Sequence, residues 1–80
     1  MLSELKPIAY LIGNSDQEMI AKFEILPNAI HRYYTTEAFL AYRFNTIKQA
    51  NIIIDKLDKP GLFVVPMFDM GDTYVVGWPS

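Results

Sequence analysis

The 80-residue chain contains few side chains that could perform catalysis or hold a metal ion. It has one histidine, His31, no cysteine, and three serines, Ser3, Ser15 and Ser80. None of them lies in a nucleophile elbow, a glycine-rich phosphate loop or a metal-binding spacing. The sequence therefore predicts a protein that is not an enzyme and that binds neither a cofactor nor a metal ion.

Two carboxylates near the end of the chain lie close together in the sequence. Asp69 and Asp72 flank Met70 and Gly71 and could in principle meet a cation. Aspartates at a turn more often accept hydrogen bonds from nearby backbone amides. We therefore interpret the pair as turn residues and assign neither to a metal site.

Residues 31 to 48 form the only basic stretch with interleaved aromatic side chains. If Tyr42-Arg43-Phe44 is extended, both rings lie on one strand face, where bases could stack while cations meet phosphates. The alternative is that these rings pack in the core beneath a helix. The stretch gives a second hypothesis, a nucleic-acid-binding protein, with these candidate residues: Arg32, Tyr34, Tyr42, Arg43, Phe44 and Lys48.

Composition favours a protein partner over nucleic acid. The net charge is −2 and the isoelectric point is near 5.1, whereas nucleic-acid binders usually carry a basic surplus. Hydrophobic residues make up 51% and aromatic residues 14% of the chain. A domain of this size buries only about 60% of its unfolded surface, and no disulfide can stabilise it. We expect one compact domain over residues 1 to 80 whose apolar excess contacts another subunit or protein.

The first ten residues, MLSELKPIAY, lack the basic stretch and apolar run of a signal peptide. No run approaches the roughly 20 apolar residues that a membrane-spanning helix requires. The sequence thus predicts a cytoplasmic protein with no membrane contact.

Residues 46 to 59 carry the clearest local signal, that of an amphipathic helix. Thr46 can cap its N-terminus with Gln49 at the capping-box position, and Pro60-Gly61 ends it. Ile52 falls outside the apolar face that the helical spacing predicts. That face consists of Ile47, Ala50, Ile53, Ile54 and Leu57.

The remaining segments read mainly as strands. Residues 7 to 12 and 19 to 26 are predicted to form a first hairpin, because polar and apolar residues alternate in the second run. The alternative is a helix that begins at the capping box of Ser15 and Glu18. We favour strands at 29 to 34, with a short helix as the alternative, and at 39 to 44. The fold class is then α+β, an antiparallel sheet of four to six strands with one helix across one face and a C-terminal hairpin.

The C-terminal hairpin, residues 62 to 78, is apolar on both faces. With a Met70-Gly71 turn, Phe63, Val65 and Met67 share a face with Tyr74, Val76 and Trp78; a three-residue loop at 69 to 71 shifts the partners by one. Pro66 cannot donate to a ladder, so we expect it at an outward edge or a bulge. Because the helix covers one face only, a second layer, a dimer mate or a ligand must cover the other.

The leading functional hypothesis is a small non-enzymatic protein-interaction module of inhibitor or adaptor type. Its partner is another protein whose identity the sequence does not predict, and the chain is expected to form a homodimer through the C-terminal hairpin. Aromatic and arginine side chains are common hot spots of such surfaces. The candidate interaction residues are Phe63, Met67, Phe68, Met70, Tyr74 and Trp78.

Overall fold

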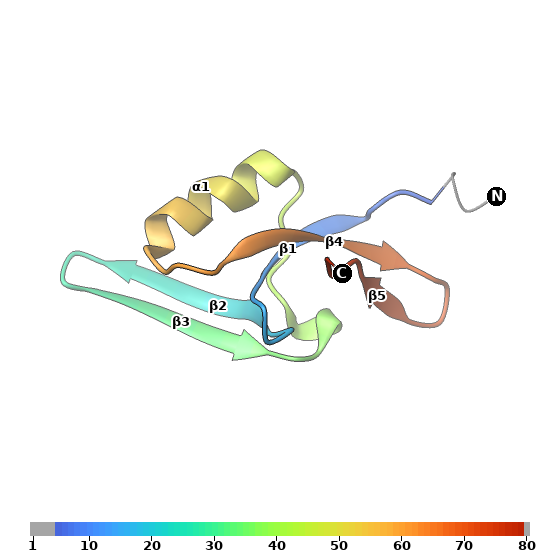
Figure 1. The fold of residues 1–80 in the computed structure, drawn as a ribbon, viewed down its shortest axis with the longest axis horizontal. Coiled ribbons are helices and arrows are strands. Elements are labelled where there is room, and N and C mark those ends of the chain that lie inside the picture. The colour runs from blue at the N-terminus through green and yellow to red at the C-terminus, as the bar shows by residue number, and fades with distance from the viewer. Residues whose placement is uncertain (1–4, 80) are drawn as a thin grey trace.

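The computed structural model describes residues 5–79, which form a five-stranded antiparallel sheet with one α-helix packed against it. The α-helix α1 and a 3-10 helix η2 lie between β3 and β4 in the chain, and the sheet order is β3-β2-β1-β4-β5 (Figure 1). This confirms the predicted α+β class with its C-terminal hairpin. The elements are β1 (Ala9–Gly13), β2 (Met19–Leu26), β3 (Ala29–Thr35), η2 (Ala38–Leu40), α1 (Ile47–Leu57), β4 (Phe63–Asp69) and β5 (Tyr74–Val76).

Helix α1 forms where the local signals place it. The Thr46 hydroxyl accepts a hydrogen bond from the Gln49 amide (3.1 Å), and the Gln49 side chain accepts one from the Asn45 amide (3.2 Å). These two bonds satisfy donors that the first helical turn leaves free. At the other end Asp58 adopts a left-handed conformation, φ 50°, which ends the helix.

The predicted apolar face of α1 is largely the buried one. Ala50 and Leu57 are fully buried, and two isoleucines between them are partly buried. Ile47 departs from the prediction, since it lies in the first turn and is 51% exposed. Ile52 is also exposed, as the helical spacing predicts.

Strands β1 and β2 separate directly after the turn that joins them, and the chain later passes between them. They pair at Gly13 and Met19. Beyond that pair, the Tyr42 amide donates to the Ile20 carbonyl (2.9 Å). The two strands of the first predicted hairpin therefore diverge beyond this pair, and residues 42 to 44 lie between them.

The inserted residues are bonded to β1 as well as to β2. Tyr10 and Phe44 exchange both of their backbone hydrogen bonds, at 2.9 and 2.8 Å. This is one antiparallel bridge and not a strand, so the predicted strand at 39 to 44 is wrong. The first part of that stretch is instead the 3-10 helix η2, whose preceding residue Glu37 donates its amide to the Thr35 hydroxyl (3.0 Å).

The crossing between β1 and β2 carries the chain from one face of the sheet to the other. Residues Ala38 and Ala41 pack on the first face, and α1 packs on the second. Each face therefore has its own buried cluster. We call them the first core, which contains Ala9, Leu11, Met19, Ala41, Val65 and Met67, and the second core, which contains Ile12, Ile20, Phe44, Ala50 and Leu57.

Strand β2 changes the faces of its side chains partway along. A bulge lies between Ile20 and Lys22. Before it, Met19 belongs to the first core, whereas after it Phe23 packs against the second. An extra residue in one strand reverses the alternation beyond it, so the regular alternation predicted for residues 19 to 26 is interrupted.

The C-terminal hairpin turns one residue later than either expected turn. Gly71 has φ 99° and begins a two-residue turn in which the Met70 amide donates to the Thr73 carbonyl (2.9 Å). Asp69 consequently stands opposite Tyr74. The face assignment of the two-residue alternative is nevertheless confirmed, because strand partners share a face and Met67 pairs with Val76.

The second apolar face of the hairpin is covered within the same chain. Val65 and Met67 are fully buried in the first core, under η2 and the indole of Trp78. The Trp78 ring meets that of Phe63 edge to face, with centroids 6.4 Å apart. Two short segments, η2 and the residues around Trp78, thus form a second layer that covers the apolar face of the hairpin.

Pro66 lies in β4, where it pairs with Tyr10 of β1 and stands opposite Gly77, one residue beyond the end of β5; it lies neither on the edge strand nor at a bulge as expected. Its carbonyl accepts the Gly77 amide (2.9 Å), so its own nitrogen also points toward β5. The lost donor therefore falls at the point where β5 has ended. A side chain on Gly77 would also collide with the proline ring, since a Cβ there would lie 2.9 Å from Cγ of Pro66.

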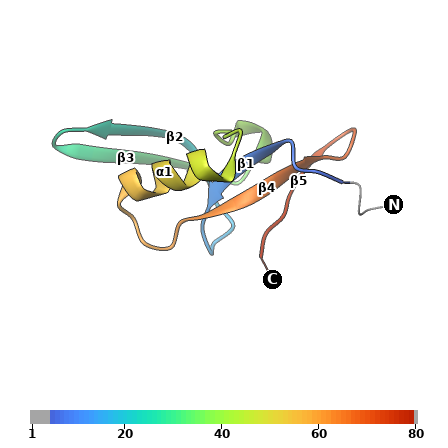
Figure 2. The ribbon, with the colours of Figure 1, turned by 90° about the horizontal axis from the view of Figure 1, so that it is seen from above.

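The fold is elongated, with principal extents of 48 × 22 × 22 Å. The β2–β3 hairpin extends one end and the β4–β5 hairpin the other, as Figures 1 and 2 show. The accessible surface is 5588 Å², compared with about 4900 Å² for an average folded protein of 9.2 kDa. Within residues 5–79, no helix has the length and apolar character needed to cross a membrane.

The packing of Trp78 on Gly13 makes a first prediction. An alanine Cβ at position 13 would lie 2.5 and 2.8 Å from two carbons of the indole, so the ring must move. We expect Gly13→Ala to lower the free energy of unfolding by about 1–3 kcal/mol and to shift the emission of this single tryptophan to longer wavelength. Urea unfolding followed by fluorescence measures both effects.

Ser15→Ala, at an exposed position in the same turn, is the matched control and should change neither quantity. Emission from Gly13→Ala identical to that of the wild type would contradict the described packing.

Candidate functional site

The six predicted interaction residues fall into two groups in the structure. Met67 is 0% exposed and lies in the first core, while Phe63 and Trp78 pack against that core and are half-buried. Met70 and Tyr74 are exposed, at 47% and 37%. Phe68 is intermediate. The surface available to a partner is thus the outer part of the hairpin, around its turn and β5.

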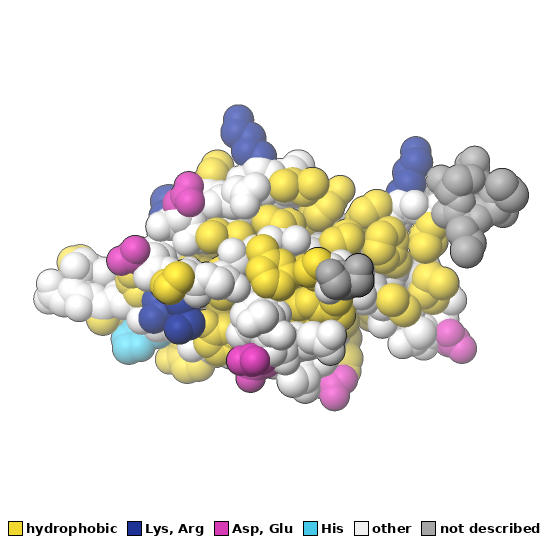
Figure 3. Space-filling view, viewed as in Figure 1, with side chains coloured by type: hydrophobic (Ala, Val, Ile, Leu, Met, Phe, Trp, Pro, Cys, Tyr) yellow, Lys and Arg dark blue, Asp and Glu magenta, His cyan; other side chains and the backbone are white. Residues whose placement is uncertain are grey.

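Exposed apolar side chains outside the predicted set adjoin this surface. Phe39 and Leu40 on η2 are exposed at 61% and 55%, and η2 lies against β5. Val75 on β5 is exposed as well. On the face drawn in Figure 3, hydrophobic side chains extend from α1 toward the β4–β5 end of the molecule. No sequence signal could have placed Phe39 here, because its position depends on the crossing between β1 and β2.

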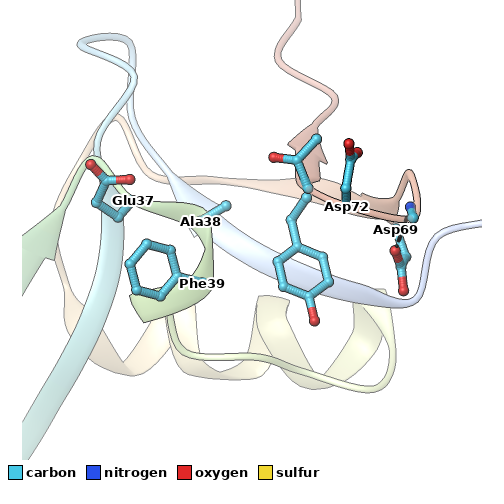
Figure 4. A pocket seen from close by; sticks show the side chains of 8 residues that line it. Glu37, Ala38, Phe39, Asp69 and Asp72 are labelled. Atoms are coloured by element: carbon cyan, nitrogen blue, oxygen red, sulfur yellow. Dashed lines mark hydrogen bonds between the residues drawn. The ribbon is translucent and has the colours of Figure 1, made fainter.

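A groove lies between η2 and the tip of the β4–β5 hairpin. It has a volume of about 380 Å³. Figure 4 shows the Phe39 ring on one side and Asp69 and Asp72 of the hairpin on the other. We call it the η2–hairpin groove; its lining residues are Glu37, Ala38, Phe39, Asp69, Gly71, Asp72, Thr73 and Tyr74.

The carboxylates around the groove do not converge on one point. In Figure 4 the side chains of Glu37, Asp69 and Asp72 point in different directions. Asp69 Oδ1 accepts the Gly71 amide (2.9 Å), as predicted for a turn aspartate. Among residues 5–79, no group of three acidic, histidine or cysteine side chains is placed to hold a metal ion.

Arg43 joins the crossing segment to the hairpin. Its guanidinium carbon lies 5.0 Å from the centroid of the Tyr74 ring, a cation–π distance. The ring of Tyr74 also lines the η2–hairpin groove. The Tyr74 ring therefore contacts the cationic side chain of Arg43 and also borders the acidic η2–hairpin groove.

The candidate nucleic-acid residues do not form one strip. Phe44 is buried in the second core, and the Tyr42 ring meets Phe23 edge to face with centroids 5.1 Å apart. Arg43 reaches Tyr74 on the opposite face. Phe44 therefore packs in the core beneath the helix, which is the alternative to nucleic-acid stacking that the sequence left open.

The other members of that set are also separated. Arg32 donates to the carbonyl of Leu57 (2.7 Å), which satisfies a free acceptor at the C-terminal end of α1. Lys48 is exposed on α1. His31, adjacent to Arg32 on β3, is exposed, and Ser3 and Ser80 lie outside the described residues.

Comparison with known proteins adds no relative. No protein family, no curated protein and no solved structure matches the chain.

Tyr34 provides the second prediction. Its hydroxyl oxygen is buried and has no hydrogen-bond partner among the described residues. Burying an unpaired hydroxyl costs about 1–3 kcal/mol. We expect Tyr34→Phe to raise the free energy of unfolding by about 1 kcal/mol, as measured by urea denaturation. Tyr42→Phe removes an exposed hydroxyl and should stay within about 0.5 kcal/mol of the wild type. A loss of stability in Tyr34→Phe would show that its hydroxyl has a partner.

Proposed function

We propose that this protein is a small non-enzymatic interaction module, of inhibitor or adaptor type, that uses its C-terminal hairpin to bind protein surfaces. The observation that carries the proposal is the free edge of β5, which has β4 on one side only and is flanked by exposed apolar side chains. The first partner is a second copy of the chain, joined through this edge.

The backbone geometry of β5 supports strand addition. Because the Gly77 amide bonds to β4, the alternation of an antiparallel ladder turns the N–H and C=O of Tyr74 and the N–H of Val76 outward. The Val76 carbonyl also faces out but accepts the Trp78 amide (3.0 Å). Three backbone groups remain for a neighbouring strand. Residues 70 to 79 contain no lysine or arginine, which are the usual protection of such an edge.

A second copy meets this edge with its own equivalent edge. Antiparallel pairing of two identical strands is compatible with a two-fold axis, so each copy offers the same surface to the other. Val75 and Tyr74 then add side-chain contacts on opposite faces of the extended sheet. The accessible surface of the chain exceeds the average for its mass, which leaves area for such a contact.

The non-enzymatic part of the proposal is supported by the placement of the chemically active groups. His31 is exposed on β3, at a distance in the sheet from the β4–β5 hairpin, and the groove carboxylates point apart (Figure 4). Nucleic-acid binding has less support, because Phe44 is buried and Arg43 contacts Tyr74. Cytoplasmic location stays a prediction from the sequence.

Self-association gives the third prediction. We expect light scattering to find a dimer at tens of micromolar protein, and Val75→Lys to shift it to monomer, because a charged side chain on the edge strand opposes pairing. Ile52→Lys is the matched control: the two residues are both 45% exposed, but Ile52 lies on α1. Circular dichroism checks that both variants are folded.

A wild-type protein that is monomeric at these concentrations would contradict self-association. So would an equal effect of the two lysine substitutions.

A further inference from the structure

We propose that the η2–hairpin groove binds a basic segment of a partner protein, in particular an arginine side chain flanked by an apolar residue. This inference rests on the proposed interaction role and adds the chemical class of the partner. The groove lies on the face of β5 that carries Tyr74, whereas the proposed dimer is joined through the backbone edge of β5. Tyr74 borders both surfaces, so the two proposals are tested by separate measurements.

The groove has the dimensions of a side-chain site. Its volume of about 380 Å³ is near the lower end of the range of about 300–1000 Å³ for ligand pockets. Its walls come from two elements that are distant in sequence, η2 with Glu37 before it and the β4–β5 turn (Figure 4). Each wall carries an aromatic side chain, Phe39 on one and Tyr74 on the other.

The negative charge of the groove favours a positively charged ligand. Glu37, Asp69 and Asp72 contribute three negative charges, and none of the lining residues is cationic. The whole chain has a net charge of only −2, so the groove is more acidic than the chain as a whole. An acidic surface of this kind attracts cations and repels phosphate groups, which disfavours nucleic acid here.

The ring of Tyr74 identifies the preferred cation. The guanidinium of Arg43 already lies 5.0 Å from its centroid, which shows that this ring accepts a planar cation. Arg43 is not among the residues that line the groove, whereas Tyr74 is, and the Tyr74 side chain is 37% exposed. Arginine stacks on aromatic faces and pairs with carboxylates in a way that the compact lysine ammonium does not.

The exposed ring of Phe39 supplies the apolar half of the site. At 61% it is the most exposed large hydrophobic side chain among the described residues. It stands beside Glu37, which carries one of the three carboxylates. A ligand that pairs a guanidinium with an adjacent apolar side chain contacts both kinds of group at once. Aromatic anchors surrounded by polar groups are typical of interface hot spots.

The test uses the full chain and fluorescein-labelled peptides. The probe alternates arginine and leucine; comparison peptides replace arginine by lysine or by glutamate. Fluorescence anisotropy at low salt should show binding of the arginine peptide, weaker binding of the lysine peptide and none of the glutamate peptide. Because surface charges are screened, affinity for the arginine peptide should fall as salt rises.

Substitutions locate the site. The double variant Glu37→Gln with Asp72→Asn should weaken binding of the arginine peptide about fivefold, since each exposed charge contributes modestly. Asp69 is kept because it caps the turn. Phe39→Ala should weaken binding at least tenfold. Glu24→Gln removes an exposed carboxylate from β2 and is the matched control, expected to change affinity by less than twofold.

Circular dichroism verifies that each variant is folded, and Phe39→Leu offers a milder change should Phe39→Ala fail to fold. Equal binding of arginine and glutamate peptides, no binding of any peptide, or equal effects of Glu24→Gln and the double variant would each overturn the inference. Light scattering measures the mass of the protein in solution and so tests the proposed dimer separately. A dimer without peptide binding removes the groove inference alone, and a monomer that binds the arginine peptide removes self-association alone.

Discussion

The architecture depends on three main-chain hydrogen bonds that hold residues 42 to 44 between β1 and β2. Without them, the exposed backbone groups of Tyr10 and Ile20 would face a gap in the middle of the sheet, where an unpaired group costs free energy. With them, one chain supplies cover on both faces. The crossing thus explains how residues 5–79 bury two clusters on opposite sides of a sheet with one α-helix.

The predictable parts of the fold were those specified by neighbouring residues. Thr46 and Gln49 define the start of α1 locally, and its bounds differ from the prediction by one or two residues because the left-handed Asp58 ends it before Pro60-Gly61. The turn after β1 is equally local, since the Asn14 side chain accepts the amides of Asp16 and Glu18. Such signals act within a few residues and depend little on distant segments.

The unpredictable parts depend on contacts between distant segments. The strand propensity of Tyr42 and Phe44 favours a strand, but only Phe44 forms a bridge because β1 and β2 leave room for a short insertion. The bulge in β2 likewise has no local signature. For the candidate surface, Met70 and Tyr74 could be found from the hairpin pattern, whereas the burial of Met67 depends on η2.

Pro66 has a consequence for how long any complex at the β5 edge persists. Because it cannot donate to the Gly77 carbonyl, the β4–β5 ladder lacks one hydrogen bond at this pair, and β5 ends at Val76. A strand added at this edge finds only a few backbone partners, and few interactions must break for it to leave. Differences among related complexes lie mostly in the dissociation rate. The proline therefore limits the number of backbone hydrogen bonds in the strand addition proposed at this edge, which favours fast dissociation.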